Sequence, residues 1–250
     1  KMCLIVVGWQ AHPAFPLVVA ANRDEFYARP SAPAAYWSDA PEIIAGRDLE
    51  ASGTWLGVTR QGRFAAVTNV REPGIAPGRL SRGELTRNFL QGGQSASDYL
   101  GGLERSAYSG FNLLLSDGKM LCYASNRGPI VQTLEAGVYG LSNHLLDSPW
   151  PKLLTARQRF SAALSKLPDQ QQFFDILADD EIVPDNELPD TGVPLDWERR
   201  LSAIFVRSPN YGTRASTVVA VNAAGTVFFE ERSFGPNGQP LQSSVISTGV

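Results

Sequence analysis

Short runs of β-branched and aromatic residues, separated by turn-forming residues, dominate the first 70 positions of the chain. Met2 to Trp9 and Leu17 to Asn22 are typical of buried strands. Thr54 to Arg60 and Arg63 to Asn69 flank Gln61-Gly62, where glycine supplies the positive φ that a tight turn requires. The pattern therefore predicts pairs of antiparallel strands in this part of the chain.

Apolar residues at helical intervals follow in the middle of the chain. Ser81 to Glu84 has the spacing of a capping box, and Ser95 to Glu104 fits a second short helix. Ser148 is the predicted N-cap of the clearest helix, with Pro149 in its first turn, and Asp169 is the predicted start of another. We therefore expect several helices that each bury one apolar face.

Strand patterns also occur on both sides of the last two helices. They cover Phe111 to Ser116, Lys119 to Ala124 and Gly137 to Asn143 before these helices, and Leu201 to Arg207, Thr217 to Asn222 and Thr226 to Glu231 after them. The order of strands, helices and further strands predicts an α+β fold with mainly antiparallel sheets. The length fits a single domain over residues 1–250.

Residues 179–190 contain six acidic residues, two prolines and no basic residue. Such a segment is typical of a solvated loop, and the alternative is a lid over a pocket. The sequence leaves both interpretations open.

Composition and charge narrow the classes of function. Hydrophobic residues make up 43% of the 250 positions and charged residues 19%, which is typical of an ordinary folded protein. The 22 basic and 25 acidic residues give a net charge of -3, which argues against binding to nucleic acid or to an anionic membrane surface. Because the apolar runs are far shorter than the ~20 residues that span a bilayer, we do not expect an integral membrane protein.

The N-terminal residues and the cysteines bear on the compartment. One lysine and a short apolar run, followed by the polar Gln10 and His12, do not form the pattern of a signal peptide. Cys3 and Cys122 are too few for a disulfide framework, and two histidines give no zinc-ligand spacing. We therefore expect a reduced, cytoplasmic protein without a metal site.

Cys3 is the first candidate for chemistry. A chain that begins at Cys3 would carry its own base, because an α-amino group with a pKa of ~7.7–8.0 can take the thiol proton. The alternative interpretation is a small core residue, since free cysteine is among the most buried residue types. Lys1-Met2 precede Cys3 in this sequence, and their retention would block the mechanism.

Polar residues gather at the predicted strand ends. Asn22 to Glu25 follow the second strand with a guanidinium and two carboxylates, which can stabilise a thiolate or orient an ammonium. Asn69 and Asn143 end two other strands, where amides can donate to the oxyanion of a tetrahedral intermediate. Arg214, within Tyr211 to Thr217, adds an arginine before a late strand. The alternatives are a charged loop and asparagines that serve turns.

Several motifs occur together and in order along essentially the whole chain. Met2 to Ile5 is followed by Ala20 to Pro30, which contains the letters NRDE. The further blocks are Gly53 to Gly57, Ala66 to Asn69, Arg82 to Leu85, Gly110 to Leu113, Asn126 to Gly128, Tyr139 to Asn143, Pro149 to Lys152 and Tyr211 to Arg214. This set resembles the NRDE family, whose eukaryotic members are called transport and Golgi organization protein two.

The resemblance implies a fold similar to that of N-terminal-nucleophile hydrolases, with two antiparallel sheets stacked between helical layers. It also implies a likeness to choloylglycine hydrolases and acid ceramidase, which cleave amide bonds of amphiphilic substrates with an N-terminal cysteine. The residues that follow the order of that pattern are Cys3, Arg23, Asp24, Asn69, Asn143 and Arg214. Because the hydrolases space their arginine and aspartate three apart, Glu25 is an alternative to Asp24, and Asn22 an alternative to Arg23.

Two functions follow as expectations. The first is hydrolysis of a C–N amide bond in an amphiphilic small molecule, in which Cys3 attacks, Arg23 lowers the thiol pKa and the two asparagines stabilise the oxyanion; such an enzyme needs no cofactor. The second is non-catalytic carriage of haem or an acyl lipid, because the resemblance implies roles in haem movement and lipid homeostasis. No Cys-x-x-Cys-His motif is present, so haem would bind reversibly, with Cys3, His12 or His144 as candidate axial ligands.

Overall fold

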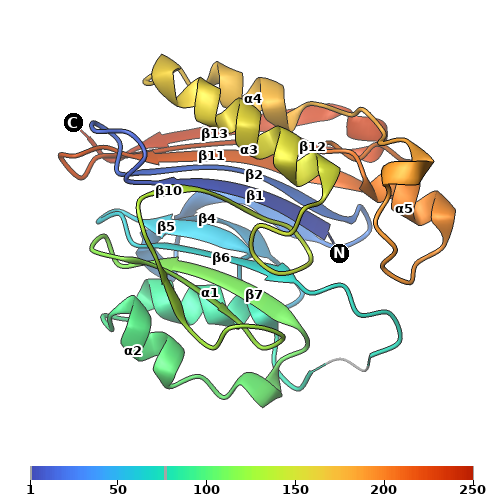
Figure 1. Ribbon diagram of the computed structural model, residues 1–250. Helices are drawn as coiled ribbons and strands as arrows, with labels where there is room; N and C mark the ends of the chain where they lie inside the picture. The colour runs from blue at the N-terminus through green and yellow to red at the C-terminus, as the bar shows by residue number, and fades with distance from the viewer. Residues whose placement is uncertain (1, 76–77, 250) are drawn as a thin grey trace.

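Two antiparallel sheets lie face to face between two helical layers in the computed structural model, which describes residues 2–75 and 78–249 (Figure 1). The helices are α1 (Arg82–Gln91), α2 (Ala96–Gly101), α3 (Pro151–Ala163), α4 (Gln171–Leu177) and α5 (Leu195–Leu201). Short 3₁₀ turns cover Arg105–Ala107, Leu164–Lys166, Asp185–Glu187 and Pro236–Gly238. The chain therefore has the expected α+β fold, an αββα sandwich.

The strand order of each sheet explains how distant segments meet. Sheet A has the order β10 (Gly137–Leu141), β1 (Met2–Trp9), β2 (Leu17–Phe26), β11 (Tyr211–Val221), β12 (Val227–Phe234), β13 (Pro240–Ser247). Sheet B has the order β3 (Ser31–Trp37), β4 (Ala40–Asp48), β5 (Leu56–Thr59), β6 (Phe64–Asn69), β7 (Phe111–Ser116), β8 (Leu121–Ser125), β9 (Gln132–Leu134). Sheet A thus places β10 and β11 on either side of the β1–β2 hairpin.

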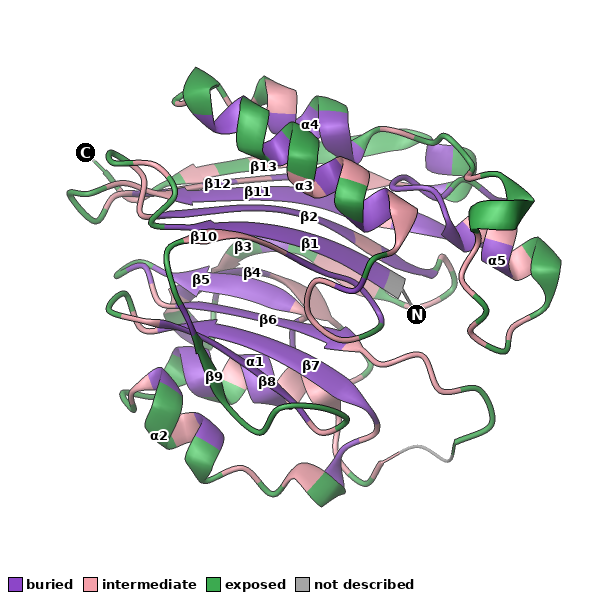
Figure 2. Ribbon diagram, in the orientation of Figure 1, coloured by how far each residue is buried: buried purple, intermediate pink, exposed green. Residues whose placement is uncertain are grey.

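Alternation along the strands builds three core layers (Figure 2). In β1, Ile5 and Val7 enter the core between the sheets, whereas Leu4 and Val6 pack against α3 and α4. Helices α1 and α2 cover the outer face of sheet B, where Cys122 is fully buried. Because side chains alternate, Cys3 lies on the same face of β1 as Ile5, between the two sheets.

Several local predictions are confirmed. Gly62 has φ +82° in the β5–β6 hairpin. The backbone N–H of Ser81 donates to Glu84 Oε1 at 3.3 Å, as a capping box requires. Ser95 is the N-cap of α2 and accepts from the Asp98 N–H at 3.1 Å.

Other predictions are wrong. The strand expected over Leu201 to Arg207 is not formed: α5 ends at Leu201, and the residues that follow form turns and irregular backbone. The helix expected to start at Ser148 has Trp150 as its N-cap, and the helix expected at Asp169 begins at Gln171. Strands β3, β4, β9 and β13 have no counterpart in the sequence prediction.

Candidate functional site

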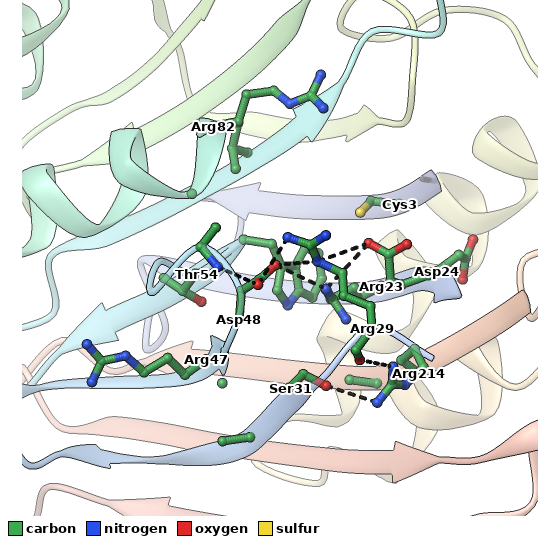
Figure 3. Close-up of a pocket in the computed structure, with 18 of the residues that line it drawn as sticks. Cys3, Arg23, Asp24, Arg29, Ser31, Arg47, Asp48, Thr54, Arg82 and Arg214 are labelled. Carbon is green, nitrogen blue, oxygen red and sulfur yellow. Dashed lines mark hydrogen bonds and ion pairs between the residues drawn. The ribbon is translucent and has the colours of Figure 1, made fainter. Parts of the chain in front are cut away.

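A cavity of about 590 Å³ opens among the ends of both sheets and the first turn of α1 (Figure 3). Its volume lies within the ~300–1,000 Å³ typical of small-molecule sites. Cys3, Arg23 and Arg214 come from sheet A, Asp48 and Asn69 from sheet B. The cavity therefore contains a candidate nucleophile together with several of the polar side chains predicted from the sequence.

Cys3 sits at the start of β1 and its side chain is largely buried, with 8% of the residue exposed. Its backbone N–H donates to Asn143 Oδ1 at 3.0 Å, and its carbonyl accepts from Ser142 Oγ at 2.8 Å. Burial raises the pKa of the Cys3 thiol to about 12; the negative charge of Asp24 adds to this, and Arg23 opposes it. In this chain the nitrogen of Cys3 belongs to a peptide bond with Met2, and Lys1 lies outside the described residues.

The structure brings Asn69 and Asn143 together beside Cys3. Asn143 uses Oδ1 for the Cys3 nitrogen and donates from Nδ2 to the backbone oxygen of Asn69 at 2.8 Å. Asn69 is the last residue of β6 and lines the cavity. The Asn143 amide therefore fixes the position of Cys3, whereas the Asn69 side chain is the one that borders the space where a substrate would lie.

The NRDE residues lie within β2, which runs to Phe26, and not in a loop after it as predicted. Alternation separates them into two pairs. Arg23 pairs with Cys3 across the two strands and faces the cavity, as Glu25 does. The charged groups of Arg23 and Glu25 are 3.7 Å apart. Asn22 and Asp24 face the helical layer. The geometry therefore puts Arg23 across from Cys3 and Glu25 next to Arg23, while Asp24 is the carboxylate whose charge adds to the effect of burial on the Cys3 pKa.

The other pair, Asn22 and Asp24, is buried against the helical layer and the residues that follow α5. Asn22 is fully buried and donates from Nδ2 to the backbone oxygens of Leu177 and Ile204, at 2.8 and 2.9 Å. Asp24, 2% exposed, accepts from Thr213 Oγ1 at 2.7 Å and is also among the residues that line the cavity. Burial raises the pKa of Asp24 to about 6, and the charge of Lys152 opposes that rise.

A charged cluster forms the wall of the cavity below Arg23. Arg29 makes a bidentate pair with Asp48, with distances of 2.7 and 3.1 Å, and Asp48 also lies 3.8 Å from Arg23. The Arg29 pair lowers the pKa of Asp48, although burial alone would raise it. Asp48 therefore stays ionised next to the guanidinium of Arg23.

Arg214 borders the cavity, but its guanidinium is directed to the backbone. Nη1 donates to the carbonyls of Phe26, Tyr27 and Arg29, at 3.1, 3.3 and 2.8 Å, and Nη2 donates to Ser31 Oγ at 3.0 Å. These bonds hold the connection between β2 and β3 in place. The structure therefore gives Arg214 a positioning contact and does not bring its guanidinium to Cys3.

The sequence did not single out several charged residues of this site. Arg82, in the first turn of α1, lines the cavity and donates to the backbone oxygen of Gly110 at 2.9 Å. Glu231 is 4% exposed and links the sheets, accepting from the Ala34 N–H at 2.7 Å. Lys152, 5% exposed, lies on the helical side of sheet A. Arg82 and Lys152 lie in two of the blocks that carry the family resemblance, Arg82 to Leu85 and Pro149 to Lys152, whereas Glu231 lies in none.

Arginines outnumber carboxylates among the residues that line the cavity. Among the described lining residues, six are arginines and four carry carboxylates: Arg23, Arg29, Arg47, Arg79, Arg82 and Arg214 against Asp24, Glu25, Asp48 and Glu231. Arg47 and Arg79 are paired with Asp39 and Glu104, which lie outside this set, so part of the excess is neutralised. The lining therefore offers guanidinium groups that can bind an anionic group, with most of their charge already paired.

The rim at α1 is held by backbone contact, because a Cβ on Gly53 would meet the carbonyl oxygen of Gly83 at 2.5 Å.

Neither histidine belongs to the cavity. His12 lies in the turn between β1 and β2, at the end of β1 remote from Cys3, and His144 Nδ1 contacts Ser148 Oγ at 2.7 Å. In the described part of the chain, no three His, Cys, Asp or Glu residues are grouped so that they could hold a metal ion. Of the three candidate haem ligands, Cys3 alone lines the cavity.

Comparison with known proteins places this chain in a family. Residues 2–236 match the sequence family described as transport and Golgi organisation 2. The chain belongs to this family. The Mus musculus protein Transport and Golgi organization 2 homolog is 39% identical over 258 residues, covering 93% of this chain and 93% of that protein. The Drosophila melanogaster protein Transport and Golgi organization protein 2 is 28% identical over 271 residues, covering 95% of each.

A solved structure shares the fold of this family member. A mutant of the conjugated bile acid hydrolase from Clostridium perfringens aligns with a TM-score of 0.53 and 10% identity, over 98% of this chain and 92% of that one. The likeness is consistent with the αββα sandwich of N-terminal-nucleophile hydrolases. Among residues 2–75 and 78–249, no helix has the length and apolar character needed to cross a bilayer.

Proposed function

We propose that this chain, when it begins at Cys3, is a cysteine hydrolase that cleaves the C–N amide bond of an amphiphilic small molecule. The observation that carries the proposal is the place of Cys3: its sulfur borders the cavity while its nitrogen is held by Asn143. An α-amine at that nitrogen would lie next to the thiol it has to deprotonate. Arg23, directly across the strand pair, supports the thiolate.

The reaction follows from these positions. The α-amine takes the thiol proton, and the sulfur attacks the amide carbonyl. The C–N bond then breaks, and the α-ammonium gives its proton to the leaving amine. Water cleaves the resulting thioester, which releases the carboxylic acid and restores the thiol. Asn69, which borders the cavity, is the side chain proposed to donate to the oxyanion.

The guanidinium groups that line the cavity support a substrate with an anionic end. A panel of N-acyl amino acids, with matched uncharged N-acyl amides, tests this preference. We expect the anionic amides to react faster with a chain that begins at Cys3. If no amide or thioester in such a panel acylates Cys3, the hydrolase proposal fails.

A direct test of the nucleophile does not need a substrate. The rate of Cys3 alkylation is measured against pH on a chain that begins at Cys3, with Cys122 followed separately by peptide mapping. An apparent pKa well below the ~8.5 of a free thiol supports the proposal. An ordinary or unreactive thiol contradicts it.

One observation supports a second function. With Cys3 inside a peptide bond, burial raises the thiol pKa to about 12, so the thiol is protonated at neutral pH and the cavity can hold an anionic amphiphile without cleaving it. In that state we propose reversible binding of haem or an acyl lipid. A haemin titration of the full chain tests the haem case, and the absence of a saturable spectral change at micromolar protein would contradict it.

A further inference from the structure

Lys152 is a buried cation in an unfavourable place. It is the second residue of α3, directly after Pro151, and 5% of it is exposed. A cation in the first turn is opposed by the helix dipole, and a buried ammonium is costly unless partners offset its charge. A lysine that local rules disfavour twice therefore needs a compensating role.

The contacts of Lys152 place it on a segment that also touches Asn22 and Asp24. Nζ donates to the backbone oxygen of Leu201 at 2.8 Å. Three residues further, Ile204 accepts from Asn22, and the Val206 N–H donates to Thr213 Oγ1 at 2.9 Å. Thr213 in turn donates to Asp24. The ammonium and the carboxylate are therefore joined by one buried segment, residues 201–206, on the helical side of sheet A.

The charges around Lys152 come from four elements. Asp24 on β2, Glu198 on α5 and a thiolate at Cys3 on β1 favour its ammonium form, whereas Arg71, after β6, opposes it. Burial outweighs these charges and lowers the pKa of Lys152 to about 8. At neutral pH the ammonium and the Asp24 carboxylate are thus both mainly charged, and each offsets the other.

We propose that Lys152 is a positioning residue of the Cys3 site: its buried ammonium offsets the charge of Asp24 on the helical side of sheet A and so favours the thiolate of Cys3 on the cavity side. The inference rests on the hydrolase function proposed above. It assigns to the helical layer a share of the electrostatic control that the cavity residue Arg23 exerts from the other face.

The test is a double-mutant cycle read by the pH profile of Cys3 alkylation, on the 250-residue chain and on the same chain beginning at Cys3. Lys152→Met is expected to raise the apparent pKa of Cys3 by about one unit, which slows alkylation about 10-fold below that pKa. Asp24→Asn is expected to lower it. The double variant is expected to return close to the parent value, because the two charges offset each other.

A purely structural role gives a different result. Asn22→Ala removes an anchor of the same segment without removing a charge, so it is expected to lower the melting temperature and leave the apparent pKa of Cys3 unchanged. Lys166→Met makes the same substitution at an exposed lysine and controls for the loss of net charge. If folded Lys152→Met keeps the parent pKa, Lys152 only anchors Leu201 and the inference is wrong.

Failure of the proposed function gives a different result from failure of the Lys152 inference. In that case Cys3 of the unsubstituted chain, begun at Cys3, is alkylated with the ordinary thiol pKa of ~8.5. That result overturns both proposals. A depressed parent pKa that Lys152→Met does not move overturns only the role of Lys152. If Lys152→Met does not fold, the double variant is compared with Asp24→Asn, because the double variant buries no unpaired charge. A higher apparent pKa of Cys3 in the double variant than in Asp24→Asn supports the role of Lys152, and equal values overturn it.

Discussion

The two faces of β2 use neighbouring residues of one motif for different purposes. Arg23 and Glu25 point into the cavity, where their charged groups lie 3.7 Å apart and 12% of the Arg23 side chain is exposed. Asn22 and Asp24 point into the helical layer, where their polar atoms meet backbone and hydroxyl partners at 2.6 to 2.9 Å. Short hydrogen bonds hold the helical face in place, whereas the cavity face places the Arg23 guanidinium where a ligand can reach it.

The largest expected effect concerns Cys3, the proposed nucleophile at the cavity. In a chain beginning at position 3, Cys3→Ser is expected to lower amide or thioester turnover by at least about 10³-fold, because the nucleophile is lost. Cys122→Ala is the matched control, since Cys122 is buried between sheet B and its helices. Equal activity in the two variants would place the chemistry elsewhere.

Asn22→Ala tests the helical face. Removing the amide leaves the carbonyls of Leu177 and Ile204 without this donor, so we expect the free energy of unfolding to fall by about 2–4 kcal/mol. Ser216→Ala, which removes one bond to Asn22 Oδ1, is expected to cost about 1 kcal/mol. Denaturant unfolding measures both. A neutral Asn22→Ala would show that the amide does not hold the helical layer.

Arg23→Ala tests the cavity face. The Arg23 charge favours the thiolate, so its loss is expected to raise the apparent pKa of Cys3 alkylation by about one unit. Arg47→Ala is the comparison, because Arg47 also lines the cavity but makes a bidentate pair with Asp39, at 2.6 and 2.7 Å. We expect little change there. Similar shifts in both variants would point to net charge alone.

Asp24 gives the most gradual effect, a slope of stability with pH. Because the folded state raises the pKa of Asp24 from 3.8 to about 6, it holds this proton to higher pH than the unfolded chain does. Its contribution to stability is therefore fully present below about pH 4 and is lost as the pH rises through 6, by about 2–3 kcal/mol in total. Comparing Asp24→Asn with the parent from pH 4 to 7 measures this; an identical slope contradicts it.

Part of the candidate site could be predicted from strand ends alone. Cys3, Asn69 and Asn143 meet because β10, β1 and β6 each bring one polar end to the same region. Which of the NRDE residues face the cavity could not be predicted, since the strand was expected to stop at Asn22. A polar residue was taken as a boundary, yet in β2 the pairing with β11 continues to Phe26.

The errors in the fold have physical causes. Residues 201–206 are apolar because they are buried under the helical layer, and a short apolar run does not distinguish a strand from a buried loop. β3 and β13 are edge strands of their sheets, where Pro33 and Pro240 are tolerated. β13 is mostly exposed, so it lacks the alternation that reveals a half-buried strand. Tertiary pairing, and not local pattern, makes these segments strands.

The close approach of Gly53 to Gly83 has a consequence for how the site can change. Two backbones touch there without intervening side chains, and the Thr86 hydroxyl is bonded to the Thr54 carbonyl beside them. The contact acts as a fixed spacer, so the distance between the β4–β5 connection and the first turn of α1 is set there by main chain. Substitutions around the rim can change its charge, whereas any side chain at position 53 would push the two backbones apart.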